Sequence, residues 1–292
     1  MSDIILPQKC LHLLDAKKVK KFQLSSPYAI MEKINGWYLT IDYLEGKWGN
    51  LTSSAGREVP SLMELSSQFK MQKGFIGNLR FIFEGIIPGL PFHTMNGLFN
   101  RKVDQAPNVK LYLHDIINLD QLSLPFNKRY SNAIVYNDLF TVTFENQIKL
   151  LPILSETEKE ATFYYWFDKL TSEGKEGIVA KQLSAPYHPG KRNSTMLKLK
   201  EEVEVDWLVV SVASGKEKYS ETTGTIVCKS KTGIIQKVSG MSDKERDIWF
   251  EEPGRIIGKV VKIKAMSKLP NGTLYQPRYV CVREDKLSSD ID

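Results

Sequence analysis

Short segments that set lysine beside apolar runs are the parts of this 292-residue sequence most suited to chemistry. Residues 33–36 (K-I-N-G) place Lys33 just before a glycine turn and an apolar run, where a strand edge could hold it toward a pocket. Met196–Lys200 alternates apolar and basic residues, so Lys198 and Lys200 would share one face of a strand. A lysine amine is a nucleophile only when neutral, and nearby cations favour that form. Lys198 and Lys200 are available for such activation of Lys33.

Two glutamates and a histidine lie in comparable surroundings. Glu84 is the one carboxylate of an apolar run, Glu176 opens the segment Glu176–Lys181 (E-G-I-V-A-K), and His114 lies in another apolar run. Mg²⁺ prefers oxygen ligands and keeps several waters, so Glu176 and Glu84 with substrate phosphates could hold it. An imidazole could stack on a purine, although His114 equally suits a hydrogen-bonded strand position. Taken singly, each segment also fits an ordinary structural role.

Several other classes of protein are excluded. The sequence contains no G-x-x-x-x-G-K-[ST], H-E-x-x-H or G-x-S-x-G pattern. It therefore lacks the common glycine-rich phosphate-binding loop and the usual signatures of metalloproteases and serine hydrolases. Cys10, Cys228 and Cys281 are too few and too far apart for a four-cysteine zinc site, and they fit a reducing compartment. No run reaches the ~18 apolar residues of a membrane span, and no secretory signal is visible. The net charge of +6 is compatible with a polyanionic partner and equally with a solvated surface.

The elements that must position these residues are strands joined by short turns, with a few helices between them. Runs rich in β-branched and aromatic residues predict strands at 37–44, 79–87, 109–117 and 177–183. Apolar residues at helical spacing predict helices at 60–71 and 155–170. We expect Ser155 and Glu158 to form a capping box at the start of the second helix.

From about residue 203 the pattern changes to short, regularly spaced strands. They are predicted at 206–213, 225–229, 234–238, 260–265 and 279–283, with one helix at 243–250. Five short strands and one helix suit a small barrel of the OB type. We place the boundary in the charged run 200–202, which gives an α+β domain at 1–201 and an OB-fold domain at 202–292.

In their order along the chain, these segments resemble the motifs of the covalent nucleotidyltransferase superfamily, which includes ATP-dependent DNA ligases, RNA ligases and mRNA capping enzymes. Residues 33–36 resemble motif I, and the segment around Glu84 resembles motif III. Leu113–Ile116 is similar to motif IIIa, Glu176–Lys181 to motif IV, Lys198–Lys200 to motif V and Arg283–Lys286 to the R-x-D-K of motif VI. The resemblance runs from Glu32 to Lys286 and is nearest to the minimal two-domain viral and bacterial ATP-dependent DNA ligases. It implies an ATP-grasp-like nucleotidyltransferase domain with antiparallel sheets and flanking helices, followed by an OB barrel.

The resemblance also implies a reaction, with ATP and Mg²⁺, or Mn²⁺ in its place, as cofactors. Lys33 would take AMP from ATP and pass it to the 5′-phosphate of a nick in duplex DNA, where the 3′-hydroxyl displaces it. Catalytic roles are implied for Lys33, Lys198, Lys200, Arg283 and Lys286. Nucleotide contacts are implied for Glu32, Lys33, Glu84, His114, Glu176, Lys198 and Lys200, and metal contacts for Glu176 and Glu84. We expect a monomer that acts in DNA repair, replication and recombination, in the cytoplasm or, for a viral protein, in that of the host.

Four positions depart from the family pattern and keep alternatives open. Asn35 stands where ligases usually have Asp, Tyr38 and Ser54 stand where they have Arg, and His114 replaces the aromatic residue that stacks on adenine. The two missing arginines favour an RNA ligase of the same superfamily. Asn35 is compatible with a non-catalytic nucleic-acid-binding protein on a ligase scaffold. The R-x-D-K ending and the size of the barrel favour DNA.

Overall fold

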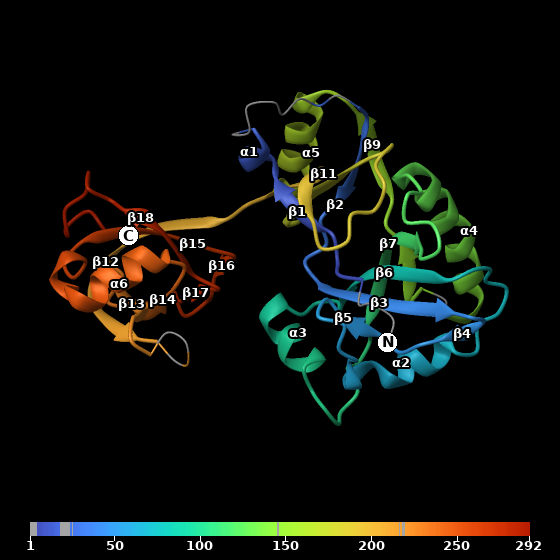
Figure 1. Ribbon diagram of the computed structural model, residues 1–292, viewed down its shortest axis with the longest axis horizontal. Coiled ribbons are helices and arrows are strands. Elements are labelled where there is room, and N and C mark those ends of the chain that lie inside the picture. Colours follow the sequence, from blue (N-terminus) through green and yellow to red (C-terminus); the bar gives the residue numbers. More distant parts are fainter. Residues whose placement is uncertain (1–4, 18–23, 25, 145, 216, 218–219) are drawn as a thin grey trace. The chain divides into compact units, whose positions relative to one another are not determined.

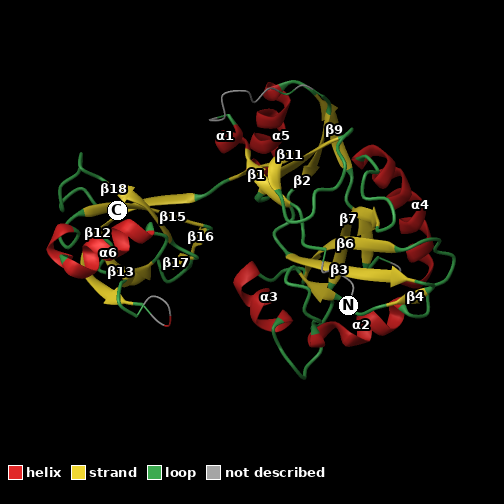
Figure 2. Cartoon of the chain, in the orientation of Figure 1, coloured by secondary structure: helices red, strands yellow, loops and turns green. Residues whose placement is uncertain are grey.

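The computed structural model describes residues 5–17, 24, 26–144, 146–215, 217 and 220–292. The chain divides into two compact units, Met1–Lys200 and Glu201–Asp292 (Figure 1). Both units mix helices with strands, which confirms the predicted α+β class (Figure 2).

The first sheet of the first unit carries most of the predicted lysines. Its pairs are antiparallel except for the parallel pair of β1 and β11. The core on one of its faces includes side chains from α1 (Leu13–Ala16) and α5 (Glu160–Ser172). In spatial order the strands are β1 (Lys9–His12), β11 (Arg192–Lys200), β10 (Gly177–Gln182), β2 (Tyr28–Glu32) and β9 (Ile153–Thr157).

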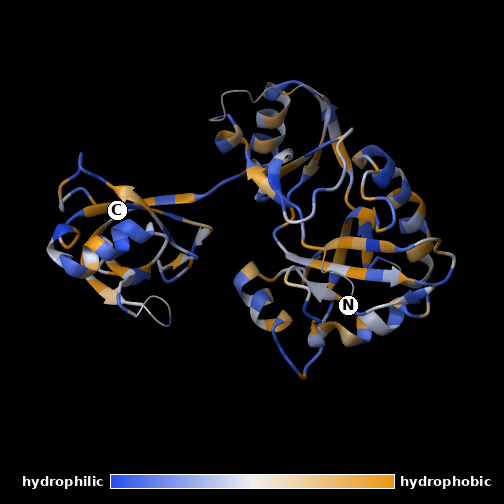
Figure 3. Ribbon diagram, viewed as in Figure 1, coloured by the Kyte–Doolittle hydropathy of each residue, from blue (hydrophilic) through white to orange (hydrophobic). Residues whose placement is uncertain are grey.

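The second sheet of this unit has an aromatic-rich core on one face. In spatial order its strands are β4 (Lys47–Trp48), β3 (Trp37–Leu44), β6 (Leu79–Ile86), β7 (Lys110–Asn118) and β8 (Ile148–Leu150), with β5 (Thr52–Ser53) paired to β3. Hydrophobic residues run along β6 and β7 (Figure 3). The same core takes in side chains from η1 (Pro60–Leu62), α2 (Met63–Phe69), α3 (Phe92–Phe99) and α4 (Phe126–Phe144).

The second unit is a five-stranded antiparallel sheet that closes on itself. A parallel bridge joins Ser239, just after β14, to Arg278 at the start of β18, and the Tyr279 N–H donates to the Ser239 carbonyl oxygen (2.7 Å). The spatial order is β14 (Ile235–Val238), β13 (Thr223–Lys229), β12 (Val203–Ser214), β15 (Val260–Ala265) and β18 (Arg278–Val282). Helix α6 (Asp243–Glu251) lies between the third and fourth strands in sequence, and η3 (Pro253–Arg255) and the short pair β16 (Ser267–Lys268) and β17 (Leu274–Tyr275) complete the unit. The five strands and the position of the helix agree with the sequence prediction of a small barrel of the OB type.

The strand predictions are confirmed to within about three residues, and the helices predicted at 60–71 and 243–250 are confirmed by η1 with α2 and by α6. The helix predicted at 155–170 differs at its start. The capping box predicted at Ser155 is wrong, because Ser155 lies in β9 and pairs with Ile30 of β2, and α5 begins only at Glu160. The sequence also gave no sign of α3 or of the 19-residue helix α4. In contrast, Ser242 and Glu245 do form a capping box at the start of α6. No helix among the described residues is long and apolar enough to cross a membrane.

Candidate active site

One face of the first sheet gathers the basic residues of the site. Lys198 and Lys200 are two positions apart in β11 and so lie on the same face. Lys200 pairs with Gly177 of β10, whose carbonyl oxygen accepts a hydrogen bond from the Lys33 backbone N–H (2.9 Å). The leucines that alternate with the two lysines are buried in the core on the opposite face. Lys33 therefore follows directly from the end of β2 into the neighbourhood of Lys200.

A β-bulge in the second sheet turns two polar side chains toward this face. Between two of its paired positions, β7 has one residue more than β6, and His114 is that additional residue. Side chains of neighbouring residues in a regular strand point to opposite faces. Because of the bulge, His114 and Asp115 both reach Lys181 of β10, while Leu113 remains in the core.

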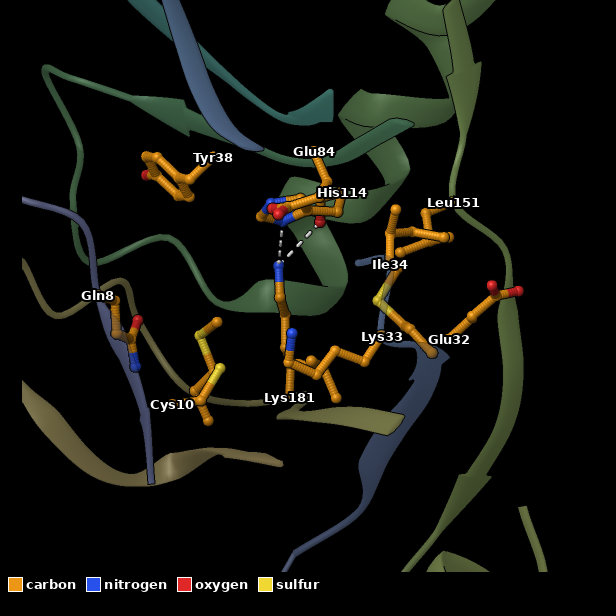
Figure 4. A pocket seen from close by; sticks show the side chains of 13 residues that line it. Gln8, Cys10, Glu32, Lys33, Ile34, Tyr38, Glu84, His114, Leu151 and Lys181 are labelled. Atoms are coloured by element: carbon orange, nitrogen blue, oxygen red, sulfur yellow. Dashed lines mark hydrogen bonds between the residues drawn. The ribbon is translucent and has the colours of Figure 1, made fainter. Parts of the chain in front are cut away.

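A cavity of about 150 Å³ lies between these two faces (Figure 4). Its lining includes four of the predicted site residues, which are Glu32, Lys33, Glu84 and His114. The structure adds Gln8, Cys10, Tyr38 and Lys181 to the lining, together with an apolar floor from residues 31, 179 and 196. The cavity thus combines apolar surface with a few convergent polar groups, as small-molecule sites do.

Lys33 and Glu176 form an ion pair at this site. Lys33 Nζ lies 2.7 Å from Glu176 Oε2, and Lys200 Nζ lies 3.8 Å from Glu176 Oε1. The exposed fraction is 22% for the Lys33 side chain, 12% for that of Glu176 and 9% for that of Lys200, so water screens these charges only in part. Burial and the neighbouring Lys200 ammonium lower the pKa of Lys198. Two predicted lysines, Lys33 and Lys200, are therefore brought together around the carboxylate of Glu176.

Two glycines, Gly36 and Gly177, allow neighbouring segments of the site to pack closely against each other. A Cβ atom on Gly36 would lie 2.6 Å from the Gly85 carbonyl oxygen and 2.9 Å from Glu84 Cγ. Gly177 has a φ of +137°, and a Cβ there would overlap the Leu199 carbonyl oxygen. Both positions therefore need glycine, which accounts for the glycine in each of the two sequence patterns.

Glu84 is held in an environment that disfavours its charge. Burial raises the pKa of the Glu84 carboxyl to about 7, and the nearby Glu176 carboxylate acts in the same direction. The Lys33 ammonium and the Gly36 backbone N–H oppose the rise. At neutral pH Glu84 is therefore close to half protonated, unlike an exposed glutamate.

His114 is part of a buried charged cluster. Burial, followed by the Lys181 ammonium, lowers the pKa of His114 to about 3, so the ring is neutral at physiological pH. Burial alone would raise the pKa of Asp115, but Arg129 and Lys181 hold it well below its usual range. Arg129 of α4 binds this carboxylate through two nitrogens, at 2.8 and 3.2 Å.

The departures from the family pattern lie in different surroundings. Tyr38 lines the cavity, with its ring centroid 6.3 Å from that of His114, and burial raises the pKa of its hydroxyl. Asn35 and Ser54 are exposed. Glu32 lines the cavity and pairs with Lys175 (3.3 Å).

Arg283 and Lys286 belong to the second unit and share a carboxylate there. Arg283 Nη1 lies 2.6 Å, and Lys286 Nζ 2.8 Å, from Asp206 Oδ2. Arg283 also binds Asp285 through two nitrogens, at 2.6 and 2.8 Å. Both cations of the R-E-D-K segment are therefore ordered by anions of their own unit.

The structure adds Lys181, Asp115, Arg129 and Cys10 to the residues expected from the sequence. Lys181 is the last residue of the E-G-I-V-A-K segment. The sequence signal that could have identified it is a lysine within an apolar strand. Nothing in the sequence relates Arg129 or Cys10 to the site, because both are brought there by tertiary structure.

Glu176 and Glu84 are the carboxylates that are expected from the sequence to hold a divalent cation. The described residues contain no group of three or more His, Cys, Asp or Glu side chains able to hold a metal ion. Mg²⁺ does not need such a group, since it is often bound by one or two carboxylates with substrate phosphates and waters. The effect of the Glu176 charge on the pKa of Glu84 shows that the two carboxyl groups interact.

The raised pKa of Glu84 predicts a pH-dependent stability. Between the ordinary value of 4.5 and about 7, the folded protein binds a proton that the unfolded chain has released, so stability falls as pH rises through this window. Glu84→Gln cannot ionise, and we expect it to exceed the wild type in free energy of unfolding by about 1–3 kcal/mol at pH 8. Near pH 4, below the ordinary value of 4.5, the difference should vanish.

Urea unfolding of both proteins at the two pH values measures this effect. Glu64→Gln, at an exposed glutamate of α2, is the control and should show no such pH dependence. A Glu84→Gln difference that is the same at both pH values would contradict the assignment.

Comparisons with known proteins agree with this fold. Residues 86–200 match the family model for the ATP dependent DNA ligase domain. The DNA ligase of Nanoarchaeum equitans is 29% identical over 244 residues, which are 70% of this chain and 42% of that protein. The DNA ligase of Thermococcus fumicolans is 26% identical over 277 residues, 81% of this chain and 47% of that protein. The chain spans less than half the length of these relatives.

Solved structures of ligases share the fold over nearly the whole chain. A structure from a structure-function analysis of Lig E DNA ligases has a TM-score of 0.72 at 17% identity and covers 95% of this chain and 99% of its own. The ATP-dependent DNA ligase from bacteriophage T7, in complex with ATP, has a TM-score of 0.56 at 17% identity, with 96% and 99% covered. The chain is thus similar to DNA ligases in sequence, and its residues 86–200 match the family model for the ATP dependent DNA ligase domain.

Proposed function

We propose that this protein is an ATP-dependent DNA ligase that seals nicks between a 5′-phosphate and a 3′-hydroxyl in duplex DNA. The observation that carries the proposal is the Lys33–Glu176–Lys200 arrangement at the edge of an enclosed cavity. It sets one potential nucleophile beside a carboxylate and a second cation, within the fold shared with the T7 enzyme that binds ATP.

In the first step, Lys33 Nζ attacks the α-phosphorus of ATP. A P–N bond forms, the bond from the α-phosphorus to the pyrophosphate oxygen breaks, and pyrophosphate leaves. The ion pair with Glu176 stabilises the ammonium over the neutral amine. The amine can therefore attack only after the ammonium has released one proton to the solvent and Glu176 has taken another partner. The nitrogen releases a second proton to the solvent as the P–N bond forms.

Mg²⁺ would be that other partner, and Glu176 and Glu84 would bind it. A divalent cation bound there would attract the negatively charged phosphates. It would also repel positive charge and so disfavour the ammonium form of Lys33. Lys198 and Lys200 add fixed charge for the negative phosphate oxygens of the same substrate.

The nucleoside would occupy the cavity between the two sheets. The neutral His114 ring would stack on the adenine, and the apolar floor would exclude water from the opposite side of the cavity. Glu84, as carboxylate or acid, can accept hydrogen bonds from the ribose hydroxyls. Glu32 would contact the nucleotide from the end of β2.

The two later steps transfer AMP to the 5′-phosphate of the nick and then expel it by the 3′-hydroxyl. The barrel-type second unit and the R-E-D-K segment support a DNA substrate. Arg283 and Lys286 would contact the departing pyrophosphate in the first step. The three thiols fit a cytoplasmic protein, and we propose that it acts as a monomer.

An RNA ligase of the same superfamily is the second candidate. The observation that favours it is the lack of arginine at positions 38 and 54, where Tyr38 faces the cavity and Ser54 is exposed. Neither residue can supply the phosphate contact that an arginine would make.

Removal of the nucleophile is the first test. Incubation with α-labelled ATP and Mg²⁺ should attach label to the wild type through a bond that survives a denaturing gel. Lys33→Ala should lose the label by at least about a thousandfold, since the nucleophile itself is removed. Lys149→Ala, an exposed lysine of β8, is the control and should label normally. Undiminished labelling of Lys33→Ala would eliminate this mechanism.

The R-E-D-K segment predicts a defect confined to one step. Arg283→Ala or Lys286→Ala should slow self-adenylation by roughly a hundredfold, as for the loss of one transition-state donor. Both variants should still seal a nick that already carries AMP on its 5′-phosphate, because no pyrophosphate leaves in that reaction. Lys259→Ala, which removes another cation near this strand end, is the control. Equal loss in both reactions, with a lowered melting temperature, would indicate a structural role instead.

The choice between DNA and RNA is tested by sealing rates on three substrates. We expect a nick in duplex DNA to be sealed faster than a nick in duplex RNA, and faster than single-stranded RNA. Because phosphate contacts by lysines release counterions, binding to nicked DNA should weaken steeply with added salt. Preference for single-stranded RNA would overturn the DNA assignment and favour the second candidate.

A further inference from the structure

Lys181 is the buried charged residue of the cavity that the proposed chemistry does not use. It lies in β10 and is 5% exposed, yet it lines the cavity (Figure 4). Its ammonium also lies over the Phe126 ring, 4.7 Å from the centroid, a position that favours a cation. A buried lysine is costly unless every one of its donors is used.

Three acceptors surround Lys181 Nζ. They are the Asp115 carboxylate (Oδ2, 3.1 Å), the His114 backbone carbonyl oxygen (2.9 Å) and His114 Nδ1 (3.1 Å). An ammonium group has three donors and no acceptor. The bulge in β7 is what aims both His114 and Asp115 at this one nitrogen.

The third of these contacts determines where His114 carries its proton. Burial lowers the pKa of Lys181, but the Asp115 carboxylate opposes this and favours the ammonium. In that form Lys181 can only donate, so Nδ1 accepts with its lone pair and the ring proton lies on Nε2. Among the described residues, no group accepts a hydrogen bond from Nε2. This N–H is therefore left for a ligand in the cavity.

We infer that Lys181 is a positioning residue that fixes His114 as the uncharged Nε2–H tautomer, so that the ring offers a nucleotide a flat face and one fixed donor. Because this N–H lies in the plane of the ring, it suits an oxygen of the ribose when the base stacks on the face of the ring. The inference rests on the proposed function in that it identifies the ligand as a nucleotide. The tautomer itself follows from contacts within the protein.

A purely structural role explains Lys181 less well. Arg129 already binds both oxygens of Asp115, so that carboxylate is paired without Lys181. A second buried cation beside an already paired carboxylate adds a desolvation cost. The contact with His114 is what Lys181 supplies and Arg129 does not.

The first part of the test is spectroscopic and uses the full chain. Two-bond ¹H–¹⁵N spectra of protein labelled at its four histidines distinguish the two imidazole tautomers, and His114→Phe identifies the His114 signals. At pH 7 we expect Nδ1 unprotonated and Nε2 protonated. In Lys181→Met the signals should shift toward a mixture of tautomers, and Lys181→Arg should keep the wild-type pattern in part. A proton on Nδ1 of the wild type would overturn the inference.

The second part is a double-mutant cycle on self-adenylation. Lys181→Met should raise the KM for ATP about tenfold and change kcat by less than about threefold, since Lys181 orients the His114 ring and does not touch the reacting atoms. In a His114→Phe background, where no tautomer exists, the same substitution should change KM by less than about twofold. Lys149→Met is the matched control for loss of a lysine.

The outcomes separate the inference from the proposed function. An equal rise in KM in both backgrounds would make Lys181 a structural residue and overturn the positioning role, and melting curves of each variant show whether folding is the cause. A wild type that takes no AMP from ATP would overturn the proposed function. The tautomer of His114 would still be decided by the spectra, whose expected pattern does not depend on activity.

Discussion

The fold around the cavity depends on one buried carboxylate. Asp115 joins the second sheet, which carries it, to Lys181 in the first sheet and to Arg129 in helix α4. Removing Asp115 would leave two buried cations uncompensated, which typically costs about 3–5 kcal/mol, whereas without Lys181 the carboxylate would still be paired with Arg129. The cluster therefore fixes the two sheets at the distance that leaves room for the cavity, and its position depends on the single bulge at His114.

The ion pair at the other side of the cavity has a different character. Lys33 and Glu176 are partly exposed and share their charges with Lys200, so a substrate can reach and rearrange them. In the proposed mechanism, this ion pair keeps Lys33 as an unreactive ammonium until Glu176 takes another partner. One side of the cavity thus contains the buried ion cluster of Asp115, and the other side contains the partly exposed ion pair of Lys33 and Glu176.

Much of the fold and part of the site could be predicted from the sequence. Strands with period-two alternation, such as Met196–Lys200, gave the shared face of the lysines, because alternation alone determines it. Helix α4 was missed because its apolar residues do not follow a clear stripe, and the predicted cap at Ser155 was wrong because pairing with β2 outweighed the local signal. The roles of Lys181 and Arg129 could not be predicted, since they arise from a bulge and from contacts between distant segments.

The central claim is that the amine of Lys33, and of no other lysine at the site, becomes bonded to AMP. Mass spectrometry of proteolytic peptides from the ATP-treated wild type measures this directly, under neutral conditions that preserve an acid-labile P–N bond. The account predicts one added AMP on the peptide that contains Lys33, with fragment ions placing it on that side chain. AMP on Lys181, Lys198 or Lys200, or on no residue, would contradict it.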